Sequence, residues 1–170
     1  MKVRPARAGP LPWGAWPRYL LIVALAAAMA GALPPGSAAA SNRAPALIVE
    51  DDRGGPVRAR ERKIRRLIRN GSRVEIRGSY CLSACTMYLA VRDLCVSRRT
   101  VFGFHGPSSP LYGIALPPES FERWSRLIAA HYPEPLRSWY LREGRNRTVG
   151  FYYLTGEQLI AMGIGECPAR

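Results

Sequence analysis

The sequence predicts an α/β fold with a mainly parallel sheet in a single compact domain, and three observations lead to this prediction. The chain has 170 residues, of which 48% are hydrophobic, so one domain can bury a core of its own. Short apolar runs typical of strands alternate with amphipathic stretches of helical period. This alternation implies right-handed crossovers, which place the connected strands parallel to one another in one sheet.

The expected elements follow one another without internal repeats. Residues 46–49 form a short apolar strand, and residues 57–69 form a helix with one apolar face among basic residues. Asn70 or Gly71 suits the left-handed cap that ends this helix. Further elements are expected in this order: a strand over 73–78, a helix over 83–94, two short strands within 95–106, helices over 117–132 and 134–144, and a Thr-capped helix within 154–167 that closes at Gly163.

The first 40 residues have the layout of a secretory signal. Four basic residues without an acid precede an apolar run over 19–33, and small residues follow with Ala38 and Ala40 at an A-x-A site. The run is shorter than the ~20 residues that span a bilayer. A cleaved signal peptide is therefore expected, with an uncleaved N-terminal membrane anchor as the alternative. Either way, residues 41–170 form the exported, periplasmic domain.

The net positive charge of the chain bears on which kinds of binding partner are expected. Of 25 basic residues, four lie in the leader, so 21 basic and 12 acidic residues remain and the exported part has a net charge of +9. Nucleic acid is not expected as the partner of an exported protein. The basic stretch 58–69 is either a solvated helix face or a contact with an anionic membrane surface.

Four cysteines, an even count in an oxidising compartment, predict two disulfides. Three pairings are open for Cys81, Cys85, Cys95 and Cys167. A zinc site that includes His105 is the alternative, but the Cys-x3-Cys spacing differs from the usual Cys-x2-Cys, and no metal is predicted. The same spacing also differs from that of thioredoxin-like redox pairs.

Three segments with complementary chemistry follow the expected strands. Gly54-Gly55 comes after the first strand, Ser83 after the second at a helix start, and His105 after the third. Sites in such sheets collect beyond the carboxyl ends of the strands. Neutral imidazole can take the proton of a serine hydroxyl, and a glycine turn and a helix start can offer N–H groups to an acyl oxygen. These residue types predict an acyl-transfer site.

Four segments strengthen this prediction by resemblance to a known family. The segments "DDRGGPV", "GSYCLSACTMYLA", "VSRRTVFGFHGP" and "YLTGEQLIAMGIGE" cover most of residues 47–168. In order and spacing they resemble the glycine turn, nucleophile segment, histidine segment and tail of the Clp protease proteolytic subunit and its crotonase-superfold relatives. The chain also resembles exported bacterial Clp-like proteins that carry "SACT" and "GFH" motifs.

The resemblance implies a ClpP/crotonase-like spiral fold and a serine hydrolase that cleaves a peptide or protein without a cofactor. Ser83 would be the nucleophile and His105 the base, with the N–H groups of Gly55 and Ala84 binding the oxyanion. It also favours the disulfides Cys81–Cys85 and Cys95–Cys167, because the latter two residues flank neighbouring strands of that superfold.

The sequence departs from the family at two positions of the site. Phe151 occupies the place of the triad acid, and Arg53 replaces the proline before the paired glycines. The third triad member is therefore unknown, with Glu157, Glu119 or a backbone carbonyl as candidates, and an inactive binding or assembly protein is the alternative function. The family's first strand and axial helix, which help to build its ring-shaped oligomers, have no counterpart here. The resemblance therefore does not imply a large ring, and a homo-oligomer of another kind is possible.

Overall fold

The computed structural model describes residues 45–109 and 115–169, and all of them belong to one compact unit, Asn42–Arg170. The expected signal or anchor over residues 1–40 lies outside this range. Among the described residues, none of the helices is both long and apolar enough to cross a bilayer.

Sheet A is the parallel sheet that the sequence predicts. It contains β1 (Leu47–Val49), β2 (Val74–Ile76) and β4 (Leu94–Val96) in the order β1-β2-β4, with both pairs parallel. Helix α2 (Val57–Arg69) connects β1 to β2. It buries Ile64 against the core, and Gly71 after it takes the left-handed conformation at φ +59°. The mixed α/β class is confirmed, and β1 and β2 pair in parallel through a helical connection.

Sheet B differs from the sequence-based prediction. It contains β3 (Tyr80–Leu82), β5 (Val101–Phe104) and β6 (Tyr152–Thr155). The β3–β5 pair is parallel, whereas the β5–β6 pair is antiparallel. The single mainly parallel sheet that we expected is therefore divided into two three-stranded sheets. Strands β3 and β6 were not predicted from the sequence.

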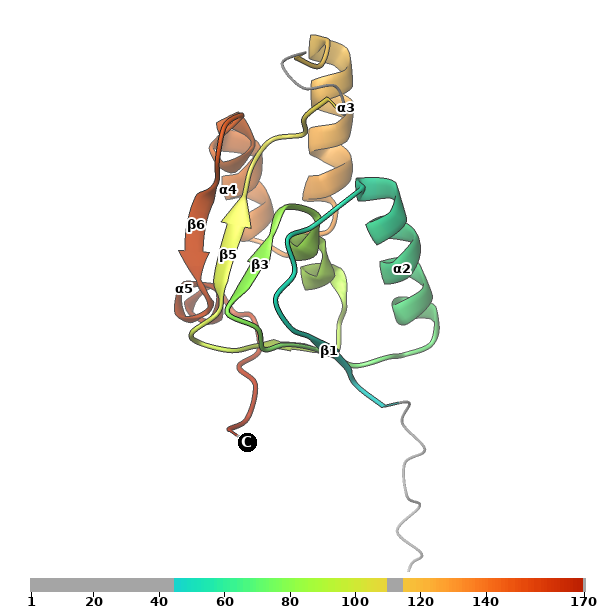
Figure 1. Ribbon diagram of the computed structural model, residues 1–170, viewed down its shortest axis with the longest axis vertical. Coiled ribbons are helices and arrows are strands. Elements are labelled where there is room, and N and C mark those ends of the chain that lie inside the picture. The colour runs from blue at the N-terminus through green and yellow to red at the C-terminus, as the bar shows by residue number, and fades with distance from the viewer. Residues whose placement is uncertain (1–44, 110–114, 170) are drawn as a thin grey trace, which may run out of the picture. The chain divides into compact units, whose positions relative to one another are not determined.

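The 3₁₀ helix η2 (Ser83–Ala90) packs against β3 and β5 of sheet B, and α2 packs against η2. Figure 1 shows α2 on one side of β3 and the edge strand β6 on the other. The helix expected over 83–94 is thus the shorter 3₁₀ helix η2, and most of its residues are buried. The remaining elements are α3 (Pro118–Ala129), α4 (Leu136–Arg142), the 3₁₀ turn η3 (Gly144–Asn146) and α5 (Gly156–Ala161).

Both ends of the last helix are formed as predicted. The Thr155 hydroxyl accepts the N–H of Gln158, and the Gln158 side chain accepts the N–H of Thr155, which makes a capping box. Gly163 follows the helix at φ +96°, and Glu166 then forms a parallel bridge with Val96 of sheet A. The C-terminal segment is thus attached to sheet A.

Candidate active site

Ser83 lies at the turn between β3 and η2, and its backbone is unusual. Its φ is +55°, and among residues 45–109 and 115–169 no other non-glycine residue has a positive φ. Such a conformation is costly for a residue with a Cβ and persists only where the surroundings enforce it. The disulfide Cys81–Cys85 closes directly over this turn, with 5.3 Å between the two Cα atoms.

A chain of buried hydroxyls also holds the turn. The Thr86 hydroxyl donates to the Ser83 carbonyl oxygen at 2.7 Å and lies 2.7 Å from the Tyr132 hydroxyl. Because the single Thr86 proton goes to a carbonyl, the Tyr132 hydroxyl must be the donor of the second bond. Burial raises the pKa of Tyr132 above its ordinary value, so this donor keeps its proton. Tyr132 and Thr86 therefore fix the backbone that carries Ser83.

His105 follows β5, the parallel neighbour of β3. The register pairs Leu82 with Gly103, so Ser83 and His105 both emerge beyond the carboxyl ends of their strands. The distance between His105 Nε2 and Ser83 Oγ is 2.7 Å. The Tyr140 hydroxyl donates to the His105 carbonyl at 3.1 Å and so fixes the backbone of this residue. The structure thus brings together the two side chains that the sequence singled out.

The environment of the imidazole favours its neutral form. Burial lowers the pKa of His105 below the ordinary 6.5, and a hydrogen bond with the backbone of Gly106 opposes this shift. The Gly106 N–H already donates to the Arg147 carbonyl at 2.9 Å. Because this N–H is already engaged, the Gly106 group that opposes the shift in the pKa of His105 is its carbonyl.

No carboxylate orients His105 in the part of the chain that the structure describes. The Phe151 ring lies edge-on against the imidazole, with 5.2 Å between the ring centroids. Glu157 instead bonds Arg98 at 2.8 Å, and Glu119 lies exposed in the first turn of α3. Neither of these two acids takes the place of a triad carboxylate here.

The paired glycines lie directly beside the Ser83 turn. Gly54 and Gly55 have φ values of +103° and +118°, a region that side chains strongly disfavour. A Cβ on Gly54 would lie 2.7 Å from the Ser83 Cβ and 3.0 Å from the Ala84 nitrogen. Only a glycine at this position lets the loop approach the turn so closely.

A cavity of about 310 Å³ opens at this junction. Gly55, Ser83, Ala84 and His105 all line it, so the four residues that sequence reasoning assigned to the site meet at one surface. The other lining residues, most of them apolar, are Pro56, Val57, Thr86, Gly106, Pro107, Ser108, Ser109, Trp124, Ile128 and Tyr132. Such an arrangement can bind an acyl group, attack it with a hydroxyl and receive the resulting charge on backbone N–H groups.

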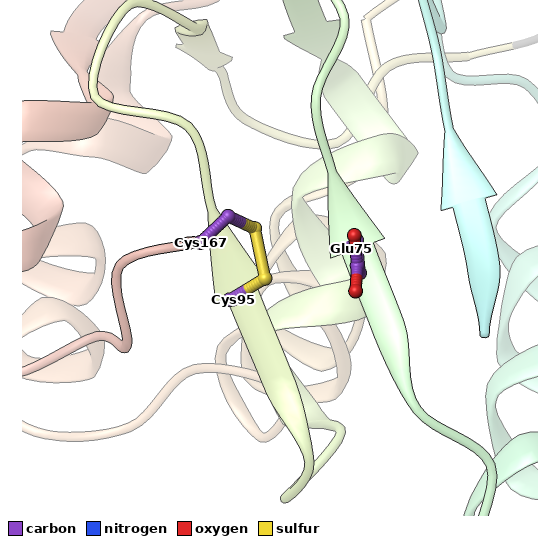
Figure 2. Close-up of side chains that lie close together, drawn as sticks. All are labelled: Glu75, Cys95 and Cys167. Atoms are coloured by element: carbon purple, nitrogen blue, oxygen red, sulfur yellow. A yellow bond between two sulfur atoms is a disulfide. The ribbon is translucent and has the colours of Figure 1, made fainter. Parts of the chain in front are cut away.

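The cysteines form the predicted pairs, Cys81–Cys85 and Cys95–Cys167. Glu75 lies close to the second pair, and the ligand atoms of the three residues are within 4.8 Å of one another (Figure 2). Sulfurs joined in a disulfide are not thiolate ligands, and Glu75 bonds Arg73 at 3.0 Å and Arg77 at 2.6 Å. This cluster is therefore a structural one, and the two disulfides indicate an oxidising compartment outside the cytoplasm.

Two groups of charged or ionisable side chains lie outside the site. His131, in the turn after α3, bonds the Leu127 carbonyl at 2.9 Å. The basic side chains of α2 are mostly exposed, whereas Arg60 turns inward and is only 11% exposed. A contact between the exposed residues and an anionic membrane stays a prediction.

Sequence reasoning missed the residues that support the site. Thr86 could have been found from its spacing, because a Thr three residues after a turn residue readily bonds that residue's carbonyl. Tyr132 lies in the bend after α3 and Arg60 lies on α2, and neither residue gives a comparable local signal. No family model matches this chain, and a search of curated proteins found no match either.

Proposed function

We propose that this protein is an exported serine hydrolase of the ClpP/crotonase-like superfold that transfers an acyl group from a peptide or protein. Ser83 is the nucleophile and His105 the general base. The observation that carries the proposal is the 2.7 Å contact between Ser83 Oγ and His105 Nε2 at the rim of a cavity. The two disulfides support the exported location.

The proposed reaction has two stages. His105 Nε2 takes the Ser83 proton as Oγ attacks the acyl carbon, and the carbonyl oxygen becomes an oxyanion that the N–H groups of Gly55 and Ala84 stabilise. His105 then gives the proton to the leaving amine, and the acyl group stays on Ser83 as an ester. A water molecule, deprotonated by His105, hydrolyses this ester and restores the hydroxyl.

The site works as a dyad in this proposal. The Gly106 carbonyl takes the orienting role of the triad acid, because it can accept the second N–H of the imidazole. A neutral carbonyl stabilises an imidazolium less than a carboxylate does. We therefore expect slow turnover, since in a chymotrypsin-type triad neutralising the acid costs about 10⁴ in kcat.

A non-catalytic envelope protein is the second candidate. Phe151 favours it, because an aromatic ring packs against His105 at the position where the family carries an acid. In that case the cavity binds a ligand or a partner segment, and the Ser83–His105 contact is only structural.

Covalent labelling separates the two candidates. A fluorophosphonate probe should add its mass to Ser83 in the folded protein, and the label should be absent in Ser83→Ala. His105→Ala should label at least about 100-fold more slowly, because a general base contributes typically 10²–10⁴-fold. His131→Ala is the matched control, since it removes the other histidine, and it should label at the wild-type rate. A folded wild-type protein that stays unlabelled would support the non-catalytic candidate.

A further inference from the structure

The loop that carries Gly55 is held by a clamp between β1 and α2. The Asp52 carboxylate accepts the Gly54 N–H at 2.8 Å and binds Arg60 Nη2 at 2.7 and 2.9 Å through its two oxygens. Arg60 Nη2 also donates to the Gly54 carbonyl at 2.9 Å. Both polar groups of Gly54 are thus occupied by one ion pair.

The ion pair is itself fixed from two sides. The Arg60 guanidinium lies over the Tyr88 ring, 4.5 Å from its centroid, and is 11% exposed. The Asp52 backbone bonds β3, because its carbonyl accepts the Leu82 N–H at 2.8 Å and its N–H donates to the Tyr80 carbonyl at 3.2 Å. The clamp therefore joins α2 to β3, the strand that directly precedes Ser83.

The Gly54 carbonyl and the Gly55 N–H belong to the same peptide unit. Among the described residues the only cis peptide bond is Glu134–Pro135, so this unit is trans and its C=O and N–H point in opposite directions. With the carbonyl directed toward Arg60, the N–H of Gly55 is directed away from it. Gly54 and Arg60 line one surface hollow, whereas Gly55 lines the cavity that contains Ser83.

Nothing in the two glycines would otherwise keep this orientation. Neither residue has a Cβ, so the peptide plane between them can rotate with little steric cost. A rotated plane would turn its carbonyl oxygen toward the cavity and repel a developing oxyanion. We propose that Arg60, fixed by Asp52, is the positioning residue that keeps the Gly55 N–H directed into the cavity, so that the oxyanion donor is formed before substrate binds.

This inference rests on the proposed function, and its test uses hydrolysis of p-nitrophenyl acetate by the full-length protein. Arg60→Met removes the clamp and keeps much of the apolar stem. Arg62→Met is the matched control, because it removes the same charge from an exposed position of the same helix. Each variant is assayed for kcat, for KM and for the pH dependence of kcat/KM, and its folding is checked by circular dichroism.

Arg60→Met should lower kcat about 10- to 100-fold, somewhat less than the 10²–10³-fold loss of a whole oxyanion donor. KM should stay within about twofold and the midpoint of the pH profile should not move, because His105 is untouched. A merely structural role of Arg60 would not lower kcat while leaving both KM and the midpoint of the pH profile unchanged. Should Arg60→Met fail to fold, Arg60→Lys decides, since its shorter side chain keeps the charge but loses the planar fork, and it should lower kcat at least about fivefold.

Two outcomes overturn the inference. A folded Arg60→Met with kcat within about twofold of Arg62→Met would show that the Gly54–Gly55 peptide keeps its orientation without Arg60. If Arg60→Met is unfolded, a folded Arg60→Lys at the wild-type rate would show the same. A loss that also shifts the pH midpoint would place the effect at His105 instead. By contrast, a wild-type protein without Ser83-dependent hydrolysis refutes the proposed function itself, so the two failures are distinct.

Discussion

Removing the long-range disulfide should mainly lower stability, whereas removing the short one should mainly lower the reactivity of Ser83. Cys95–Cys167 closes a loop of 72 residues in sequence, whereas Cys81–Cys85 closes one of four. The chain-entropy relation gives about 4 kcal/mol for the longer loop and about 2 kcal/mol for the shorter one. Replacing each pair with alanines should therefore cost about 2 kcal/mol more in the long-range variant, or roughly 10 °C in melting temperature.

The effect on the labelling rate of Ser83 should have the opposite order. The short disulfide closes over the turn that holds Ser83 at φ +55°, so its loss should slow fluorophosphonate labelling about 10- to 100-fold. The long disulfide joins β4 to the C-terminal segment, and its loss should change the rate less than about threefold at a temperature where the variant is folded. Denaturant titration measures the free energies of unfolding, and mass spectrometry measures the rates. Equal losses of stability, or a larger loss of rate in the long-range variant, would refute this reasoning.

Three other predictions concern the site. Because burial lowers the pKa of His105, its imidazole stays neutral to lower pH, so kcat/KM should rise with pH about a midpoint below 6.5; a midpoint at or above 6.5 would contradict this. Gly55→Ala should cost about 1–3 kcal/mol, because it only introduces backbone strain at a positive φ. Gly54→Ala adds a clash with the Ser83 turn to the same strain, so denaturant titration should find it the less stable variant. Thr86→Val should cost about 1–3 kcal/mol of stability and slow labelling of Ser83, because it removes the hydrogen bond to the Ser83 carbonyl. Thr86→Ser is the control that keeps the hydroxyl. Equal labelling rates for the two variants would show that this hydrogen bond does not position Ser83.

The positions of most helices could be predicted from local pattern, whereas the reacting side chains were predicted from residue type and from a resemblance to a known family. The bounds of α2 agree with the prediction because its apolar face and basic face alternate at helical period over 57–69. Ser83 and His105 were predicted from their residue types and from the resemblance of their segments to a known family, because the strand predicted over 73–78 ends before β3 begins. The parallel strands β3 and β5 bring the two side chains together at their carboxyl ends.

The division into two sheets could not be predicted from periodicity. Only residues 77–79 separate β2 from β3, and β3 has three residues, so the hydrophobic pattern predicted a strand over 73–78 and no separate strand after it. The chain changes sheets at Gly78, where a Cβ would collide with the backbone of Glu50 and Asp51. Such a close approach between segments far apart in sequence leaves no mark in a local pattern. The same reason explains why the Arg60 clamp and the Tyr132 hydroxyl were missed.

Phe151 has two opposite consequences for the proposed chemistry. Its ring helps to exclude water from His105, and desolvation lowers the imidazole pKa, so the base is available at lower pH. The same desolvation, without a nearby carboxylate, destabilises the imidazolium that must form when Ser83 attacks. A base with a lower pKa also abstracts a proton less readily. Both effects raise the barrier of the step in which Ser83 attacks and the imidazolium forms. A phosphonate with a good leaving group therefore tests Ser83 more sensitively than hydrolysis of a peptide bond, whose amine can leave only after this imidazolium has formed and protonated it.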